Sequence, residues 1–127
     1  MFKVHNPASV GVPAAAYSHG IEVPPNARWL YISGQVGMSE GRIGRGIEEQ
    51  SEMAWRNLLA VLASAGMGIT DVVKITAFLT SAAIVPAYRT VRDRHQAGHR
   101  PASTLLVVSA LANPEWLVEV EAIAAKG

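Results

Sequence analysis

Cysteine is absent from this chain of 127 residues, and charged residues of the two signs are few and nearly balanced. Without cysteine there is no disulfide, no thiolate metal ligand and no cysteine nucleophile. The net charge of +1 gives no electrostatic basis for binding nucleic acid. No apolar run reaches the roughly 18 residues of a membrane-spanning helix, and the N-terminal residues lack the basic and apolar regions of a signal peptide. We therefore expect a soluble, cytoplasmic protein.

Hydrophobic residues make up 50% of the chain and charged residues 17%, which predicts a folded core rather than disorder. The length predicts one domain over residues 1–127. Such a domain buries about two thirds of the surface that its extended chain would expose. A domain this rich in Ala, Val, Leu and Ile is also expected to cover part of its surface in an oligomer.

Hydrophobic periodicity predicts an alternation of strands and helices. The predicted strands are Phe2–His5, Tyr17–Val23, Arg28–Val36, Asp71–Thr80, Thr104–Val108 and Trp116–Ile123, and the predicted helices are about Ile47–Ala65 and Ile84–Ala97. A turn at Pro24–Ala27 predicts that the second and third strands form a hairpin. The glycine-rich segment Gly37–Gly46 is expected to be a mobile surface loop. This order predicts an α+β fold in which both helices pack on one face of a mixed sheet.

Two acidic residues stand on the last predicted strand. Glu119 and Glu121 are two residues apart, so their side chains point to the same face of the strand. Carboxylates on an otherwise apolar strand are costly unless that face is wet, paired or functional. The pair therefore belongs either to a solvated strand face or to the lining of a small-molecule cleft.

Five segments, in order along the chain, resemble the motifs of one family. They are Tyr17–Gly20, Ile32–Val36, Gly46–Gln50, Asp71–Thr80 and Pro101–Ala124. The chain is similar in these segments to the RidA family, also called YjgF or endoribonuclease L-PSP proteins. The resemblance implies the RidA fold, assembled as a homotrimer whose bare sheet faces meet at the centre and whose ligand clefts lie between subunits.

One position departs from the family pattern. Members that hydrolyse imines carry arginine after a Pro-Ala pair, and its planar guanidinium grips a substrate carboxylate with two hydrogen bonds. Here Ser103 follows Pro101 and Ala102. A serine hydroxyl cannot make that grip, which counts against 2-aminoacrylate deaminase activity. A neutral anchor suits a polar uncharged ligand better.

The resemblance also implies which residues line the cleft. They are Tyr17, Ser33, Gly34, Ser103, Thr104 and Glu119. Glu119 matches the family glutamate that positions or activates the attacking water, and it is the candidate general base. Tyr17 either walls the cleft or packs as an ordinary strand aromatic. Arg89, on the second helix, either restores a cation to the cleft or faces solvent.

No cofactor or metal is expected. The four histidines lack metal-ligand spacing, and no phosphate-binding or dinucleotide-binding motif is present. Of the histidines, His19 stands two residues from Tyr17 and is a further candidate for the cleft.

Three functions remain open. The first is hydrolysis of reactive enamines, imines or related small metabolites, of the imine deaminase type. The second is a non-catalytic trimer that binds a metabolite or acts as a chaperone. The third, an endoribonuclease, is disfavoured by the balanced charge and by the lack of a basic stripe interleaved with aromatic residues.

Overall fold

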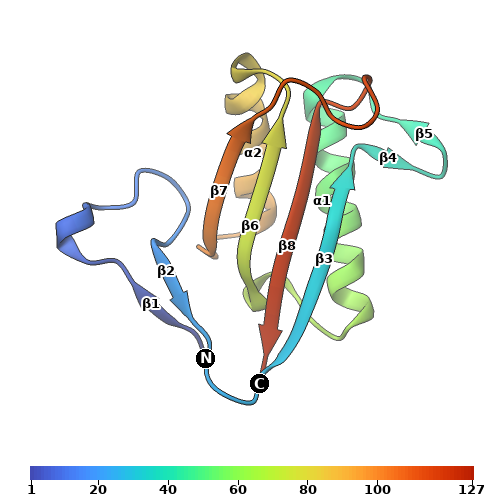
Figure 1. Ribbon diagram of the computed structural model, residues 1–127. Helices are drawn as coiled ribbons and strands as arrows, with labels where there is room; N and C mark the ends of the chain where they lie inside the picture. The colour runs from blue at the N-terminus through green and yellow to red at the C-terminus, as the bar shows by residue number, and fades with distance from the viewer.

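A four-stranded mixed sheet forms the centre of the computed structural model, which describes residues 1–127. In spatial order its strands are β3 (Arg28–Val36), β8 (Val118–Lys126), β6 (Val72–Leu79) and β7 (Ala102–Val107). β8 runs antiparallel to both of its neighbours, whereas β6 and β7 are parallel. Helices α1 (Gly46–Ser64) and α2 (Val85–Gln96) lie on one face of this sheet (Figure 1). The predicted fold class is confirmed.

Helix α1 places an apolar stripe against the sheet. Its residues Ala54, Trp55, Leu58 and Leu62 are fully buried and follow the spacing of one helical face. Glu48 and Glu49 lie in the first turn, where the helix dipole favours negative charge. The helix ends before Gly66, whose φ of 70° is the left-handed conformation that glycine adopts at low cost.

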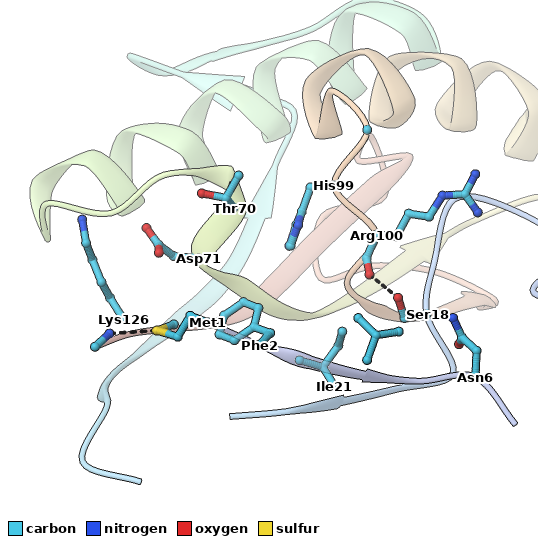
Figure 2. Close-up of a pocket in the computed structure, with 13 residues that line it drawn as sticks. Met1, Phe2, Asn6, Ser18, Ile21, Thr70, Asp71, His99, Arg100 and Lys126 are labelled. Atoms are coloured by element: carbon cyan, nitrogen blue, oxygen red, sulfur yellow. Dashed lines mark hydrogen bonds between the residues drawn. The ribbon is translucent and has the colours of Figure 1, made fainter. Parts of the chain in front are cut away.

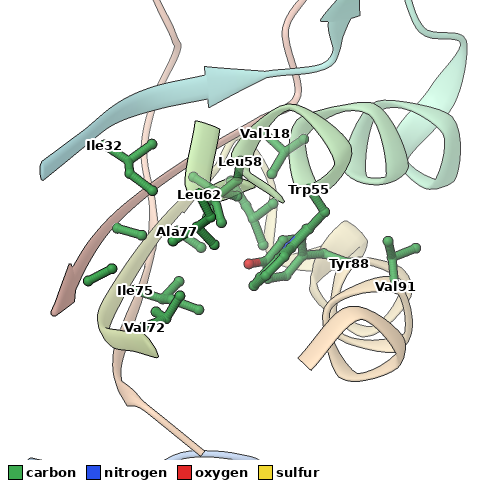
Figure 3. Packing of buried hydrophobic residues seen from close by; sticks show 14 of the residues in the cluster. Ile32, Trp55, Leu58, Leu62, Val72, Ile75, Ala77, Tyr88, Val91 and Val118 are labelled. Carbon is green, nitrogen blue, oxygen red and sulfur yellow. The ribbon is translucent and has the colours of Figure 1, made fainter. Parts of the chain in front are cut away.

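The core lies between the helices and the sheet, as Figure 3 shows. Trp55 of α1 and Tyr88 of α2 are its largest fully buried side chains. The Trp55 indole N–H and the Tyr88 hydroxyl have no hydrogen-bond partner of good geometry, although the two rings lie side by side. Burial raises the pKa of Tyr88 to about 12 because the charged phenolate would be desolvated.

Ionic contacts also join the two helices. The carboxylate of Glu52 on α1 accepts hydrogen bonds from Arg94 and His95 of α2 and from Arg56 of its own helix, at 2.7 to 2.8 Å. Burial acts to raise the pKa of Glu52, but these three donors outweigh it and hold the pKa below the usual value of 4.5. The His95 ring stacks on Trp55 with 6.0 Å between ring centroids.

Two local predictions were wrong. β2 (Gly20–Glu22) pairs with β1 (Lys3–His5) and not with β3, so Pro24–Ala27 is a connection between sheets and not a hairpin turn. β3 pairs only with β8, so its other edge is left unpaired. The glycine-rich segment holds a small hairpin of β4 (Met38–Ser39) and β5 (Arg42–Ile43).

Three short 3-10 helices complete the elements of the chain. They are η1 (Ala8–Val10), η2 (Ile69–Asp71) and η3 (Ala82–Ile84). Neither α1 nor α2 combines the length and the apolarity that crossing a bilayer would require.

The face of the sheet away from the helices is called the open face here. Its side chains are Trp29, Tyr31, Lys74, Thr76, Phe78, Thr104, Leu106, Glu119, Glu121 and Ile123. Trp29 is 50% exposed, Tyr31 73% and Leu106 45%, whereas the opposite side of the sheet is packed beneath the helices. Large apolar side chains exposed together on one face indicate a surface that another molecule covers.

Candidate site on the open face of the sheet

Ser33 and Gly34 lie in a break in the pairing of β3 with β8. Ile32 pairs with Ala122, but the next paired residue of β3, Gln35, lies opposite Val120. Ser33 and Gly34 therefore stand together opposite the single residue Glu121, which is the arrangement of a β-bulge. Bulges leave backbone groups unpaired and are common beside functional sites.

Gly34 makes room for the side chain of Glu119. A Cβ at position 34 would lie 1.8 Å from the Glu119 Oε2 atom and 2.6 Å from its Cδ atom. The carboxylate thus lies directly against the Gly34 backbone, and only glycine allows this approach. Gly34 and Glu119 are therefore in contact, and that they form part of a functional site stays a prediction.

The surroundings of Glu119 leave its carboxylate free. Glu119 is half-buried on β8, opposite Phe78 of β6. None of the six ion pairs of the chain includes it. A half-buried, unpaired carboxylate between an aromatic ring and a backbone bulge is available to accept a proton or to position water. Phe78 was missed from the sequence, although the alternation along β6 places it on this face.

Tyr17 lies at the opposite edge of the sheet, beside the start of β7. Its neighbour Ser18 forms a parallel bridge with Ala102. The Ser18 backbone N–H donates to the Pro101 carbonyl at 3.0 Å, and its hydroxyl donates to the Arg100 carbonyl at 2.6 Å. These bonds fix Tyr17 close to the segment that carries Ser103.

The rings of Tyr17 and His19 pack edge to face, with 5.7 Å between centroids. His19 Nε2 bonds to the Gly11 carbonyl at 2.9 Å, so this nitrogen carries the proton. The backbone N–H of Ala14 donates to the Tyr17 hydroxyl at 3.3 Å. His19 therefore holds the loop before Tyr17 in place.

Ser103 and Thr104 point to opposite faces of β7. Ser103 is in register with Ile75, which is fully buried beneath the helices, and Thr104 is in register with Thr76 on the open face. Residues in register share a face of a sheet. Lys74 donates from Nζ to the Thr104 hydroxyl at 2.6 Å, so this hydroxyl already has one partner.

Within one chain, Ser103 is remote from Glu119. Glu119 is in line with Phe78 of β6 and Leu106 of β7, and Ser103 lies three residues before Leu106. Two strand spacings of about 4.8 Å and three rises of about 3.3 Å separate the two Cα atoms by about 14 Å. A small ligand that touches Glu119 therefore cannot touch Ser103 of the same chain.

Arg89 lies exposed on α2 and takes part in none of the six ion pairs. Arg92, one turn further along, is buried and donates from Nε and Nη2 to Asp93 at 2.9 and 2.8 Å. The guanidinium of Arg92 is therefore committed to its neighbour, whereas that of Arg89 is free.

Two cavities of the chain are lined by none of the predicted site residues. One, of about 760 Å³, is beneath the β1–β2 hairpin, and the other, of about 400 Å³, is a groove between α1 and α2. Sequence reasoning found neither, because each is built by segments far apart in the sequence. No group of three or more His, Asp or Glu side chains has an arrangement suited to a metal ion.

Comparison with known proteins shows to which family the chain belongs. The family model described as Endoribonuclease L-PSP matches residues 8–126. The chain belongs to the endoribonuclease L-PSP family. The RidA resemblance noted in the sequence is thereby confirmed, while the meaning of Ser103 stays a prediction.

Individual relatives agree with the assignment. The 2-iminobutanoate/2-iminopropanoate deaminase of Rattus norvegicus is 34% identical over 124 residues, which cover 95% of this chain and 85% of that protein. The structure of the Rid protein YyfB from Yersinia pestis is 32% identical, with a TM-score of 0.87 and 98% of each chain covered. E. coli TdcF, solved with bound serine, is 23% identical with a TM-score of 0.75 over 91% of each chain, and it supports the fold.

Proposed function

We propose that this protein hydrolyses small reactive imines or enamines in clefts between the subunits of a homotrimer, with Glu119 as general base. The observation that carries the proposal is the free carboxylate of Glu119, held against the Gly34 bulge on the open face. Membership of the family and similarity to a protein named as a 2-iminobutanoate/2-iminopropanoate deaminase support the reaction class.

The chemistry needs one group that both takes and returns a proton. The oxygen of water bonds to the imine carbon while Glu119 accepts a proton from that water. The electron pair of the C=N bond moves to nitrogen. Glu119 returns that proton to nitrogen, which gives a carbinolamine. It then takes the proton of the new hydroxyl group and passes it to the amino nitrogen as the C–N bond breaks, so the products are a carbonyl compound and ammonia. A β-bulge commonly leaves backbone N–H groups unpaired, and such groups are suited to stabilise the charge that develops on nitrogen.

The predicted residues fall into two groups, one around Glu119 and one around Tyr17 and Ser103. A neighbouring subunit would bring one group of each chain next to the other group of a second chain. Glu119 and Ser103 of one chain are about 14 Å apart, and Ser103 lies on the helix side of the edge strand β7. The edge of one subunit that carries Tyr17 and Ser103, and not its open face, would therefore complete a cleft with Glu119 of another. The exposed Trp29 and Tyr31 support self-association through the open face. The number three comes from the family resemblance.

The side chain of Ser103 affects which substrate such a cleft would bind. In place of a bidentate guanidinium it offers a single neutral hydroxyl. We therefore expect imines without a carboxylate beside the reacting carbon to be preferred over 2-imino acids. The free guanidinium of Arg89 is the alternative anchor, and an Arg89→Ala variant that loses activity only on 2-imino acids would assign it that role.

The first experiment measures turnover. 2-Aminoacrylate and an uncharged imine would be generated in situ, and release of the carbonyl product would be timed with wild-type protein and with Glu119→Gln. The proposal expects acceleration of at least one substrate over buffer and its loss in Glu119→Gln, by about a hundredfold for a general base. No acceleration of either substrate would remove the proposal.

A gain-of-function variant tests the part assigned to Ser103. Ser103→Arg is expected to raise kcat/KM for the 2-imino acid by roughly tenfold to a hundredfold, as a hydrogen-bonded charge pair allows. Ser103→Lys is the matched control because it adds the charge without the planar fork. An equal gain with lysine would show that charge alone is missing.

Two other functions predict different results. Thermal stabilisation by a small metabolite without any turnover would indicate a binding protein. Degradation of single-stranded RNA that survives repurification and disappears in Glu119→Ala would indicate a ribonuclease. The net charge of +1 counts against the latter.

A further inference from the structure

The cavity beneath the N-terminal hairpin is separate from the proposed cleft. It lies between the β1–β2 hairpin, the η2 turn and the His99–Arg100 segment, with Lys126 at one end (Figure 2). Its volume of about 760 Å³ is typical of small-molecule sites. Neither Glu119 nor Ser103 lines it, so a ligand here would not compete for the residues of the proposed reaction.

One side of this cavity is apolar. Phe2, Val4 and Ile21 of the hairpin line it, and Val4 is 51% exposed. The centroids of the Phe2 and His99 rings are 6.4 Å apart, and the two ring planes are tilted by 44°. An aromatic or branched apolar group placed over these side chains would remove their exposed surface from water.

The end of the cavity near η2 offers hydrogen-bond acceptors. Asp71 accepts the Gly68 backbone N–H through Oδ2 at 2.9 Å, which leaves Oδ1 free. His99 Nε2 bonds to the Val72 carbonyl at 2.7 Å, so the neutral ring presents an unprotonated Nδ1. Lys126 lies at the same end and donates to the Gly66 carbonyl at 3.0 Å. Asp71 and Lys126 together leave this end near zero net charge.

The opposite end offers donors and a positive charge. Asn6 uses its Oδ1 atom to accept the His19 backbone N–H at 2.7 Å, so its amide N–H groups are free. Arg100 stands at the rim with its side chain extended outward (Figure 2), and its only side-chain hydrogen bond is a long one of 3.3 Å to the Ala15 carbonyl, so it would turn inward to meet a ligand. Figure 2 shows Asn6 and Arg100 on one side of the cavity and Asp71 and Thr70 on the other.

We propose that this cavity binds a small carboxylate with an apolar body and a hydroxyl or amino group at its far end. The carboxylate is placed toward Asn6 and Arg100, the apolar body over Phe2, and the donor group toward Asp71. The aromatic hydroxy acid 4-hydroxyphenylacetate has this chemistry and is the probe used to test the site.

The test compares three ligands by calorimetric titration of the full chain. 4-Hydroxyphenylacetate is expected to bind about tenfold more tightly than phenylacetate, which lacks the hydroxyl, or than 4-hydroxyphenylacetamide, which lacks the charge. Asp71→Asn keeps an acceptor for the Gly68 N–H and should reduce the advantage of the hydroxyl. Arg100→Ala should reduce the advantage of the carboxylate over the amide.

A cavity-filling pair of variants locates the binding. Val4→Trp places a large ring in the cavity and should reduce affinity at least tenfold. Val10→Trp adds the same ring at an exposed position that does not line the cavity and should leave affinity unchanged. Absence of binding to wild-type protein, equal binding by Val4→Trp, or equal affinity for the acid and the amide would each overturn the proposal. Imine turnover should be unchanged in Val4→Trp, so failure here is distinct from failure of the proposed reaction.

Discussion

Replacing Gly34 by alanine tests the contact on which the candidate site depends. The added Cβ would lie 1.8 Å from Glu119 Oε2, 2.6 Å from Cδ and 2.8 Å from Cγ. Ordinary contact begins near 3.4 Å, so the carboxylate oxygen must move by 3.4 − 1.8, or 1.6 Å. Overpacking of this kind costs about 1 to 3 kcal/mol. Because a side chain can rotate away, we expect a cost of about 1 kcal/mol in free energy of unfolding.

The effect on catalysis should be larger than the effect on stability. A shift of about 1 Å in a catalytic group can lower the rate about a hundredfold. Gly34→Ala is therefore expected to lower kcat for imine hydrolysis by that factor while the protein stays folded. Gly20→Ala is the matched control, since a Cβ there meets its nearest atom at an ordinary 3.5 Å.

A double-mutant cycle separates the clash from other effects of the new methyl group. Glu119→Ala removes all three atoms that the Cβ at position 34 would strike. In that background Gly34→Ala should cost little, which gives a coupling energy of about 1 kcal/mol in urea unfolding. If Gly34→Ala costs the same with and without the Glu119 side chain, the carboxylate does not lie against Gly34 and the described site is wrong.

Three further predictions concern other parts of the molecule. Glu52→Gln should lower the free energy of unfolding by about 1 to 2 kcal/mol at neutral pH. The pKa of Glu52 is lowered by folding, so its contribution is fully present above about pH 4.5 and is lost as the pH falls through the folded pKa. Urea unfolding should therefore show a smaller penalty for Glu52→Gln at pH 3 than at pH 7. Tyr88→Phe removes a buried hydroxyl without a good partner and should be neutral or stabilising by about 1 kcal/mol in thermal unfolding, whereas a marked loss would reveal an unseen hydrogen bond. Tyr31→Glu should reduce the mass of the particle to that of one chain in light scattering, while Val12→Glu, at a 92% exposed position off the sheet, should not.

The main elements could be predicted from the sequence because their patterns are local. The stripe through Ala54, Leu58 and Leu62 defines α1, and its predicted and observed ends differ by one residue. The alternation of β6 places Ile75, Ala77 and Leu79 beneath the helices. The partner of β2 could not be found in the same way. A turn at Pro24–Ala27 favours pairing with β3, but β2 pairs with β1 and leaves one edge of β3 unpaired, so the choice of partner is set by tertiary packing and not by the turn.

The candidate site, like the fold, could be predicted only in part. The family resemblance implied that Gly34 and Glu119 line a cleft, and the structure places the two in contact, while their role stays a prediction. The β-bulge that brings them together, and which face of the sheet Ser103 and Thr104 each take, follow from strand register, which no local pattern of residues reveals.

The position of β8 has a consequence for how the chain folds during synthesis. β8 follows every other strand in the sequence, yet it lies between β3 and β6 and is the only strand that pairs with β3. Until residues 118–126 have left the ribosome, β6 and β7, with α2 between them in the sequence, are the only strands of the four-stranded sheet that can pair as in the final structure. We expect the earlier part of the chain to remain incompletely folded until then, with the apolar edge of β3 open to chaperones or to other nascent chains.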